Sequence, residues 1–274
     1  VLLIGAGLMV RSFVELQRAD PGFDTEGLLT FELQLQGERY GQDARIAFVD
    51  ELRRRLGGLP GVERVSAGLV LPLLGETQSG RYGPVEALED ITLYGQADYR
   101  YVHLDYMETM GTTLLEGRVF EPSDFAGEGA AVVLIDELVA LRVWPQGGAV
   151  GQTLVIRMGP EPEEVQVVGV VEHQRSLSPA FDSQETVYFN ARNVGDPGTL
   201  QWAVRSRLGA AGLASAIRTE VAAMDPGLPV SNLREMSEVV GQVMAPTRFA
   251  LVLIAVFAVA ALAMVPPLPV KTST

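Results

Sequence analysis

Apolar residues in the first quarter of the chain follow the periods of a strand, a helix and a second strand. Over 28–36 they fall on every second position, which predicts a β-strand with one buried face. Over 43–56 they recur at three- and four-residue steps, which predicts an amphipathic helix that the glycine-rich turn at 57–61 ends. Residues 62–71 predict the next strand. The apolar positions are Leu29, Phe31, Leu33 and Leu35 in the first strand, and Phe48, Val49, Leu52 and Leu56 in the helix.

The same order of elements returns near the other end of the chain. Residues 201–207 (QWAVRSR) predict a strand, a helix follows, a turn at 225–229 ends that helix, and 230–233 predicts a short strand. The residues on one helix face are Leu213, Ile217, Val221 and Met224. Two such units, far apart in the sequence, can complete one four-stranded ferredoxin-like sheet with two helices on one face.

Residues 72–197 lie between these two units and carry their own pattern. Short β-branched or alternating runs predict strands at 131–135, 152–157, 165–171 and 185–189, and weaker signals predict helices at 105–110 and 137–143. We therefore expect a second, β-rich subdomain that is inserted into the first.

Both ends of the chain are apolar. Residues 249–265 form an uncharged run that would span about 26 Å as a helix, close to the thickness of a bilayer core. A last helix is expected to begin at Arg234 and to continue into this run. A buried core helix ended by Pro266 and Pro267 is the alternative. Residues 1–10 are too short to span a bilayer and have neither the positive start nor the cleavage site of a signal peptide, so we expect the end of a longer membrane helix.

The fold class expected from these patterns is α+β. It consists of a ferredoxin-like split βαβ subdomain with an inserted β-rich subdomain, flanked by membrane-helix segments. The expected divisions are the end of a membrane helix at 1–13, the ferredoxin-like subdomain at 14–71 and 198–247, the β-rich insertion at 72–197, a membrane helix at 248–265 and a tail at 266–274.

Composition excludes several classes of function. A formal charge of −13 argues against a nucleic-acid partner, because phosphate binding requires a basic surface. The chain has no cysteine, which excludes disulfides, thiolate metal sites and cysteine nucleophiles. Lysine occurs only at Lys271, after Val270, so the chain lacks the glycine-lysine phosphate loop of nucleoside triphosphatases.

Few residues are candidates for chemistry, and each has a simpler structural interpretation. Gly5 and Gly7 follow an apolar run as in a dinucleotide-binding turn, but the third glycine position is Val10. The acids Glu161, Glu163 and Glu164 are expected in a solvated loop, with a cation site as the alternative. The histidines, His103 and His173, are too far apart in sequence to form a local metal-binding pair. No nucleophile elbow of the GxSxG type occurs. We therefore predict no catalytic, cofactor-binding or metal-binding residue.

Several segments, in order along the chain, resemble one family. They are LLIGAGLMVRSF at 2–13, DPGFDTEGLLTFELQL at 20–35, LPGVERVSAGLVLPL at 59–73, DYMETMGTTLLEGRVF at 105–120, AVGQTLVI at 149–156, EVQVVGVVEHQRS at 164–176 and MDPGLPVSNLREMSEVV at 224–240. Together they are similar to the MacB-type, FtsX-like permease subunits of ABC transporters, in particular the duplicated bacterial permeases. The resemblance covers most of the chain. The departure is at the C-terminus, where the family continues through further membrane helices and this chain reads VPPLPVKTST.

The resemblance implies a transport subunit rather than an enzyme, with no cofactor. The expected partners are a separate cytoplasmic ABC ATPase, a second permease copy or duplicated half, and membrane lipid, with a periplasmic adaptor as a further candidate. The expected location is the bacterial cytoplasmic membrane, with the main domain on its outer side. The chain is expected to be a truncated or fragmentary copy of such a permease. Two alternatives are a membrane-tethered binding or scaffold module without transport activity, and a small-molecule enzyme that uses the N-terminal GxG.

Overall fold

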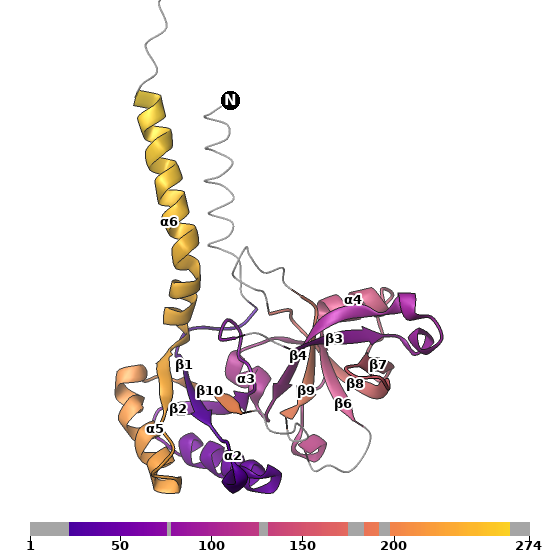
Figure 1. Ribbon diagram of the computed structural model, residues 1–274, viewed down its shortest axis with the longest axis horizontal. Coiled ribbons are helices and arrows are strands. Elements are labelled where there is room, and N and C mark those ends of the chain that lie inside the picture. The colour runs from indigo at the N-terminus through magenta and orange to yellow at the C-terminus, as the bar shows by residue number, and fades with distance from the viewer. Residues whose placement is uncertain (1–21, 76–77, 126–130, 175–183, 192–197, 264–274) are drawn as a thin grey trace, which may run out of the picture.

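The computed structural model describes residues 22–75, 78–125, 131–174, 184–191 and 198–263 of the chain. The segments expected at 1–13 and 266–274, including Gly5 and Gly7, lie outside these residues. In the described part, two β-rich bodies lie side by side and a long helix rises from one of them (Figure 1). The division of the chain into subdomains at the predicted boundaries stays a prediction.

The first body is a four-stranded antiparallel sheet in the order β11-β1-β10-β2. Its strands are β1 (Leu28–Gln34), β2 (Val62–Gly68), β10 (Thr199–Ser206) and β11 (Ser231–Glu235), and its helices are α2 (Gln42–Gly57) and α5 (Ala210–Met224). A short 3-10 helix, Glu38–Tyr40, precedes α2. This is the order that two split βαβ units produce, as predicted.

Both helices cover the same face of that sheet. Trp202 of β10 is fully buried and stacks on Phe31 of β1 with ring centroids 5.7 Å apart. Leu52 of α2 and Ile217 of α5, two of the predicted apolar positions, are also fully buried in this cluster. The three- and four-residue spacing of apolar side chains therefore places both helices on one core.

The second body is a ring of strands inserted between β2 and β10. Its strands follow the order β4-β3-β7-β8-β6-β9, and β9 pairs back with β4, which closes the ring. Their bounds are β3 (Gln78–Gly83), β4 (Gly95–Val102), β6 (Val132–Asp136), β7 (Thr153–Arg157), β8 (Glu163–Val171) and β9 (Thr186–Asn190), with β5 (Leu114–Gly117) paired to β8. Short helices connect them at α3 (Tyr106–Met110), α4 (Glu137–Val143), Val85–Leu88, Ile91–Leu93 and Pro122–Phe125.

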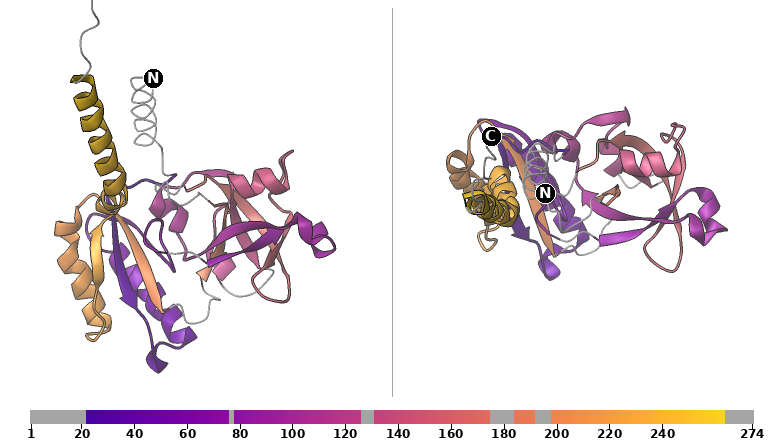
Figure 2. Two further views of the ribbon diagram at one scale, coloured as in Figure 1. Left: turned by 45° about the horizontal axis from the view of Figure 1, so that its top comes forward. Right: turned by 90° about the horizontal axis from the view of Figure 1, so that it is seen from above.

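The two bodies share a core cluster. It contains Leu28 from the sheet, Val102 and Tyr188 from the ring, and Met236 from the long helix. Backbone pairing continues from one body to the other at Gly68 and Val102. A Cβ atom at Gly68 would lie 3.1 Å from the carbonyl oxygen of Tyr101, so glycine permits this close approach. The two views in Figure 2 show the bodies in contact through this region.

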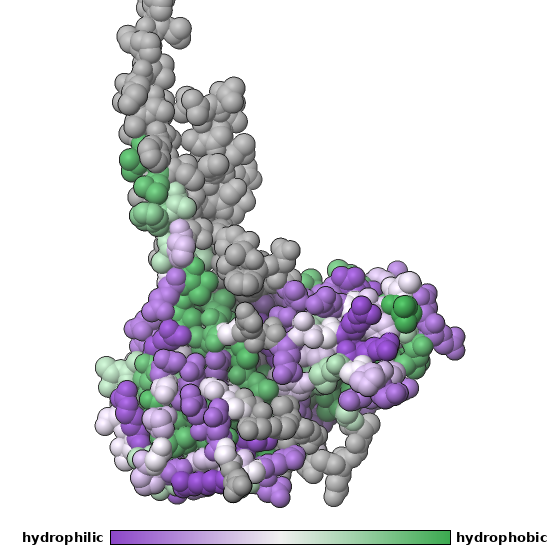
Figure 3. All heavy atoms as spheres, in the orientation of Figure 1, coloured by the Kyte–Doolittle hydropathy of each residue, from purple (hydrophilic) through white to green (hydrophobic). Residues whose placement is uncertain are grey.

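Helix α6 (Met236–Ala263) begins directly after β11, within two residues of the predicted start. Phe249, Leu253 and Val256 are exposed and follow one another at four- and three-residue steps, which places them on one side of the helix. Figure 3 shows exposed apolar surface in green on the described part of this helix. Among the described residues no helix is both long and apolar enough to cross a membrane. The segment predicted as a membrane helix, 248–265, lies partly outside those residues.

Candidate functional site

The joint between β11 and α6 is the candidate functional site. β11 ends at Glu235 and α6 starts at Met236, so no loop separates strand from helix. Met236 is fully buried, and Val239, one turn further, is 2% exposed. The helix thus leaves the sheet without a linker, and one side of its first turn packs in the core while Ser237 and Glu238 are exposed.

The carboxylate of Glu235 ties a third element to this joint. Its Oε1 accepts a hydrogen bond of 3.0 Å from the backbone N–H of Ala210, the first residue of α5. Because helix N-termini carry unpaired N–H groups and a partial positive charge, a carboxylate there is stabilising. A Cβ at Gly209 would come within 2.9 Å of this carboxylate oxygen, so glycine leaves room for the contact. The start of α5, the end of β11 and the start of α6 therefore meet at one side chain.

Further polar contacts brace the strand against its neighbours. Arg234 Nη1 donates to Gln242 Oε1 at 3.0 Å, which links β11 to the second turn of α6. Thr30 Oγ1 donates to the carbonyl oxygen of Arg234 at 3.4 Å, alongside the antiparallel pairing of β11 with β1. Hydrogen bonds therefore connect the joint to α6 and to β1, and Met236 and Val239 pack into the shared core cluster.

His173, which sequence reasoning interpreted as structural or solvated, belongs to a buried polar pair. Its Nδ1 lies 2.5 Å from Asp136 Oδ2, and both side chains are buried. Asp136 also accepts the backbone N–H groups of Val139, at the start of α4, and of Thr186, at the start of β9. Burial raises the pKa of Asp136, and the hydrogen bonds from His173 and the backbone oppose that rise. The pair therefore joins the end of β6 and the start of α4 to the segment after β8 and to the start of β9.

The remaining candidates do not assemble a reactive site. His103 is buried directly after β4, and its carbonyl oxygen accepts a hydrogen bond from the Ser66 hydroxyl. Glu163 and Glu164 begin strand β8 rather than lying in the predicted loop, because they pair with Ile156 and Val155 of β7. Within the described ranges no group of three or more histidine, cysteine or acidic side chains could hold a metal ion.

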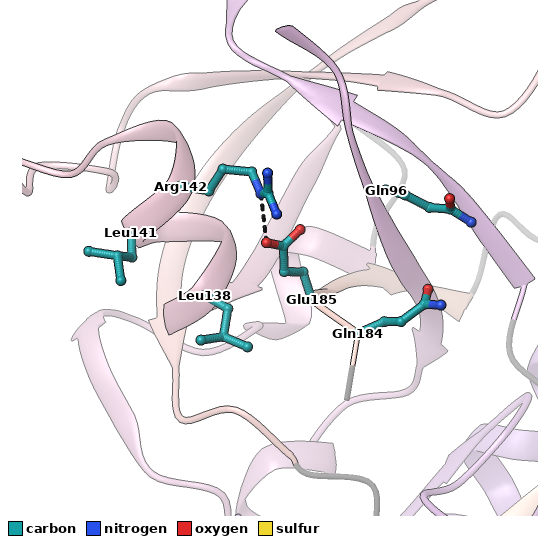
Figure 4. Close-up of a pocket in the computed structure, with 6 residues that line it drawn as sticks. All are labelled: Gln96, Leu138, Leu141, Arg142, Gln184 and Glu185. Carbon is teal, nitrogen blue, oxygen red and sulfur yellow. Dashed lines mark hydrogen bonds and ion pairs between the residues drawn. The ribbon is translucent and has the colours of Figure 1, made fainter. Parts of the chain in front are cut away.

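A hollow of about 560 Å³ on the ring is lined by Gln96, Leu138, Leu141, Arg142, Gln184 and Glu185 (Figure 4). The charges that line it are already paired. Arg142 Nε donates to Glu185 Oε1 at 2.6 Å, and the hydroxyl of Tyr82 donates to Glu185 Oε2 at 2.5 Å. Glu185 therefore accepts hydrogen bonds from both Arg142 and Tyr82 at this hollow.

Sequence reasoning placed Arg234 and Met236 at the start of the last helix but gave neither of them, nor Glu235, a functional role. Each is an ordinary residue in a turn or helix start, and its role depends on elements that lie far away in the sequence. The signal that was available is the short distance between a predicted strand and a predicted helix, with no glycine or proline between them.

Comparisons with known proteins agree with this architecture. A family profile described as the MacB-like periplasmic core domain matches residues 1–224. The macrolide export ATP-binding/permease protein MacB 1/2 of Paracoccus denitrificans is 33% identical over 119 residues, which are 43% of this chain and 16% of that protein. The chain therefore matches less than a fifth of the length of this curated relative.

Among the solved structures that resemble this chain, the first described here shows the same fold. The periplasmic region of MacB from Actinobacillus actinomycetemcomitans aligns with a TM-score of 0.51 and 14% identity, over 84% of this chain and 98% of that one. The extracellular domain of the noncanonic ABC-type transporter YknZ from Gram-positive bacteria aligns with a TM-score of 0.46 and 18% identity, over 74% of this chain and 100% of that one. Since the profile covers well over half of the residues, the chain belongs to the family of MacB-like periplasmic core domains, which are parts of ABC-type transporter permeases.

Proposed function

We propose that this chain is the extracytoplasmic core of an ABC transporter permease and that it converts the ATP-driven changes of a separate cytoplasmic ATPase into movement outside the membrane. On this proposal the domain lies at the outer side of the bacterial cytoplasmic membrane. It works as a pair of permease copies or halves, with a periplasmic adaptor as a further partner, and it has no catalytic role.

The loop-free joint between β11 and α6 is the observation that supports this proposal most directly. A displacement of α6 acts on Met236, which is buried in the cluster that the sheet and the ring share. It also acts on Glu235, which is bonded to α5. Packed interfaces of this kind move as rigid bodies rather than deform gradually. A tilt of the helix would therefore move both bodies together.

A spin-label experiment on the complete transporter tests the proposal. The permease that contains this chain is reconstituted with its ATPase in nanodiscs, and Arg218→Cys on the exposed side of α5 carries the label. This chain has no cysteine, and any cysteine elsewhere in the permease is first replaced by serine, so that the label marks one position in each copy. We expect the distance between labels in the two copies to change between the nucleotide-free and the ATP-bound, vanadate-trapped states.

The joint is tested by inserting Gly-Gly-Ser between Glu235 and Met236. We expect the insertion to abolish the ATP-dependent distance change while ATP hydrolysis continues. The matched control places the same insertion after Gly159, in an exposed turn between β7 and β8, and should keep the change. Circular dichroism verifies that both variants fold. An absent distance change in the unmodified protein would favour a binding module without transport activity.

A further inference from the structure

A buried cluster of polar side chains next to the shared core holds one guanidinium, one amide and three hydroxyl groups. Arg100 of β4 lies opposite Tyr188 of β9 in the parallel pairing that closes the ring. Its Nη1 donates to Gln174 Oε1 at 2.5 Å, and Gln174 Nε2 donates in turn to Thr112 Oγ1 at 2.7 Å. Among the described residues no carboxylate forms an ion pair with Arg100. The side chain bonded to the guanidinium is therefore neutral, and Asp98 acts on its charge without forming an ion pair.

Three polar atoms around this cation form no hydrogen bond of ordinary geometry, although the Tyr106 hydroxyl interacts with Arg100 and Gln174. They are Nε of Arg100 and the hydroxyl oxygens of Tyr106 and Tyr188, and all three are buried. Tyr106 is 2% exposed and Tyr188 is fully buried, with their ring centroids 6.2 Å apart. Buried donors without partners are rare in native proteins, and a cluster of them calls for a further group.

The chemistry of these atoms defines the missing group. Burial raises the pKa of the Tyr106 hydroxyl and of the Tyr188 hydroxyl, so both keep their protons and can donate. The guanidinium Nε also carries a hydrogen, and it cannot accept a hydrogen bond. A water molecule could accept from these donors, but it would leave the positive charge of Arg100 without an ion-pair partner, which is costly away from solvent.

We propose that Arg100, Tyr106 and Tyr188 bind one small monovalent anion with the size and charge of chloride. Arg100 as a whole is only half-buried, so the site communicates with the surface along that side chain. Tyr106 and Tyr188 belong to the cluster that also contains Met236 and Val239 of α6. An anion here would therefore stabilise the region where the helix joins the two bodies.

Thermal unfolding of the full chain in two salts tests this site. Sodium chloride is titrated against sodium gluconate at constant ionic strength, because gluconate is too large for a site formed by three converging side chains. A ligand that binds only the folded state raises the unfolding temperature in a saturable manner. We expect this rise with chloride and not with gluconate. An equal response to the two salts would overturn the proposal.

Single hydroxyl deletions then locate the site. In Tyr106→Phe and Tyr188→Phe the ring stays and one donor is lost, and we expect the apparent chloride dissociation constant to rise about tenfold, as for the loss of one hydrogen bond to a charged group. The matched control is Tyr99→Phe, because the Tyr99 hydroxyl donates to the carbonyl oxygen of Arg81 elsewhere in the ring. It should leave the dissociation constant unchanged.

Two results would contradict the assignment. One is an unchanged chloride response in both Tyr106→Phe and Tyr188→Phe. The other is a gain in stability of Tyr188→Phe that is the same in both salts, because that gain would show that the hydroxyl is simply unsatisfied. A crystal grown with bromide should show its anomalous signal beside Arg100 if the proposal holds, and an absence of signal there would count against it.

Discussion

Single carboxylates organise several turns of this domain. Asp124 accepts hydrogen bonds from Arg118 Nη1 at 2.6 Å, from Arg118 Nη2 at 2.9 Å and from the backbone N–H of Glu121 at 2.8 Å. Asp225, after α5, accepts from Tyr40 and from the backbone N–H of Gly227. In each case one side chain satisfies groups that a turn leaves unpaired, so the turn keeps a single conformation.

Asp124 makes a prediction about pH. Its hydrogen bonds with Arg118 hold the pKa of this carboxyl below its ordinary value. Because this pKa is lower in the folded state, ionised Asp124 adds to the free energy of unfolding. The contribution is complete above the unfolded-state pKa of about 4 and is lost as the pH falls through the folded-state pKa. We expect Asp124→Asn to lose about 1 kcal/mol at pH 7, a modest amount because Arg118 is partly exposed.

Urea unfolding from pH 7 to pH 2.5 provides the measurement. The stability gap between the wild type and Asp124→Asn should narrow below about pH 4, because only the wild type loses this interaction on protonation. Other acidic groups titrate in both proteins and cancel in the comparison. A gap that stays constant over the whole range would show that the charge of Asp124 has no role.

Residues such as Glu235 and Arg100 could not be identified as functional from the sequence. Neither belongs to a motif, and each acquires its role from partners such as Ala210 and Gln174 that only the folded chain brings near. The same holds for His173, because its partner lies far away in the sequence. Sequence reasoning gave His173 a structural role without being able to name Asp136 as its partner.

At the scale of elements, the spacing of apolar residues in helix α5 determines which of its side chains are buried. Ile217 is fully buried between α2 and the sheet, whereas its neighbour Arg218 is exposed. We expect Ile217→Ala to destabilise the protein by about 2–4 kcal/mol, because it removes apolar contacts and leaves a cavity. Chemical denaturation measures this change. Arg218→Ala, one residue away, should stay within about 0.5 kcal/mol of the wild type. Equal losses in the two variants would contradict the packing of α5.

Elements in which apolar residues recur at a regular period were predictable from the sequence. Strands that contain glycine, polar residues and tyrosines in place of such a period were not. The strands and helices of the first body agree with the predicted segments to within a few residues. The sequence pattern did not predict β3, β4 or β5. β3 (QSGRYG) contains glycine and polar residues, and in β4 (GQADYRYV) tyrosines supply the buried face. Tyr82 and Tyr99 bury their rings while their hydroxyls find acceptors, a combination that apolar alternation does not detect.

At the scale of the whole molecule, the shared core cluster predicts that the sheet and the ring unfold together. The two tryptophans of the chain lie one in each body, since Trp202 is in β10 and Trp144 follows α4. In Trp144→Phe the fluorescence of Trp202 reports the sheet alone, while far-UV circular dichroism reports both bodies. We expect the two signals to give the same denaturation midpoint. Separate midpoints would show that the cluster does not couple the bodies.

The closed ring also affects how the chain acquires its structure during synthesis. The last pairing of the ring joins β4 to β9, so the ring cannot close before Asn190 has emerged from the ribosome. The first sheet waits longer, because β1 and β2 are separated until β10 fills the gap between them. Early strands thus remain with open edges for most of translation, a state that is prone to aggregation. A nascent polypeptide of this topology would depend on chaperones until its final third is made.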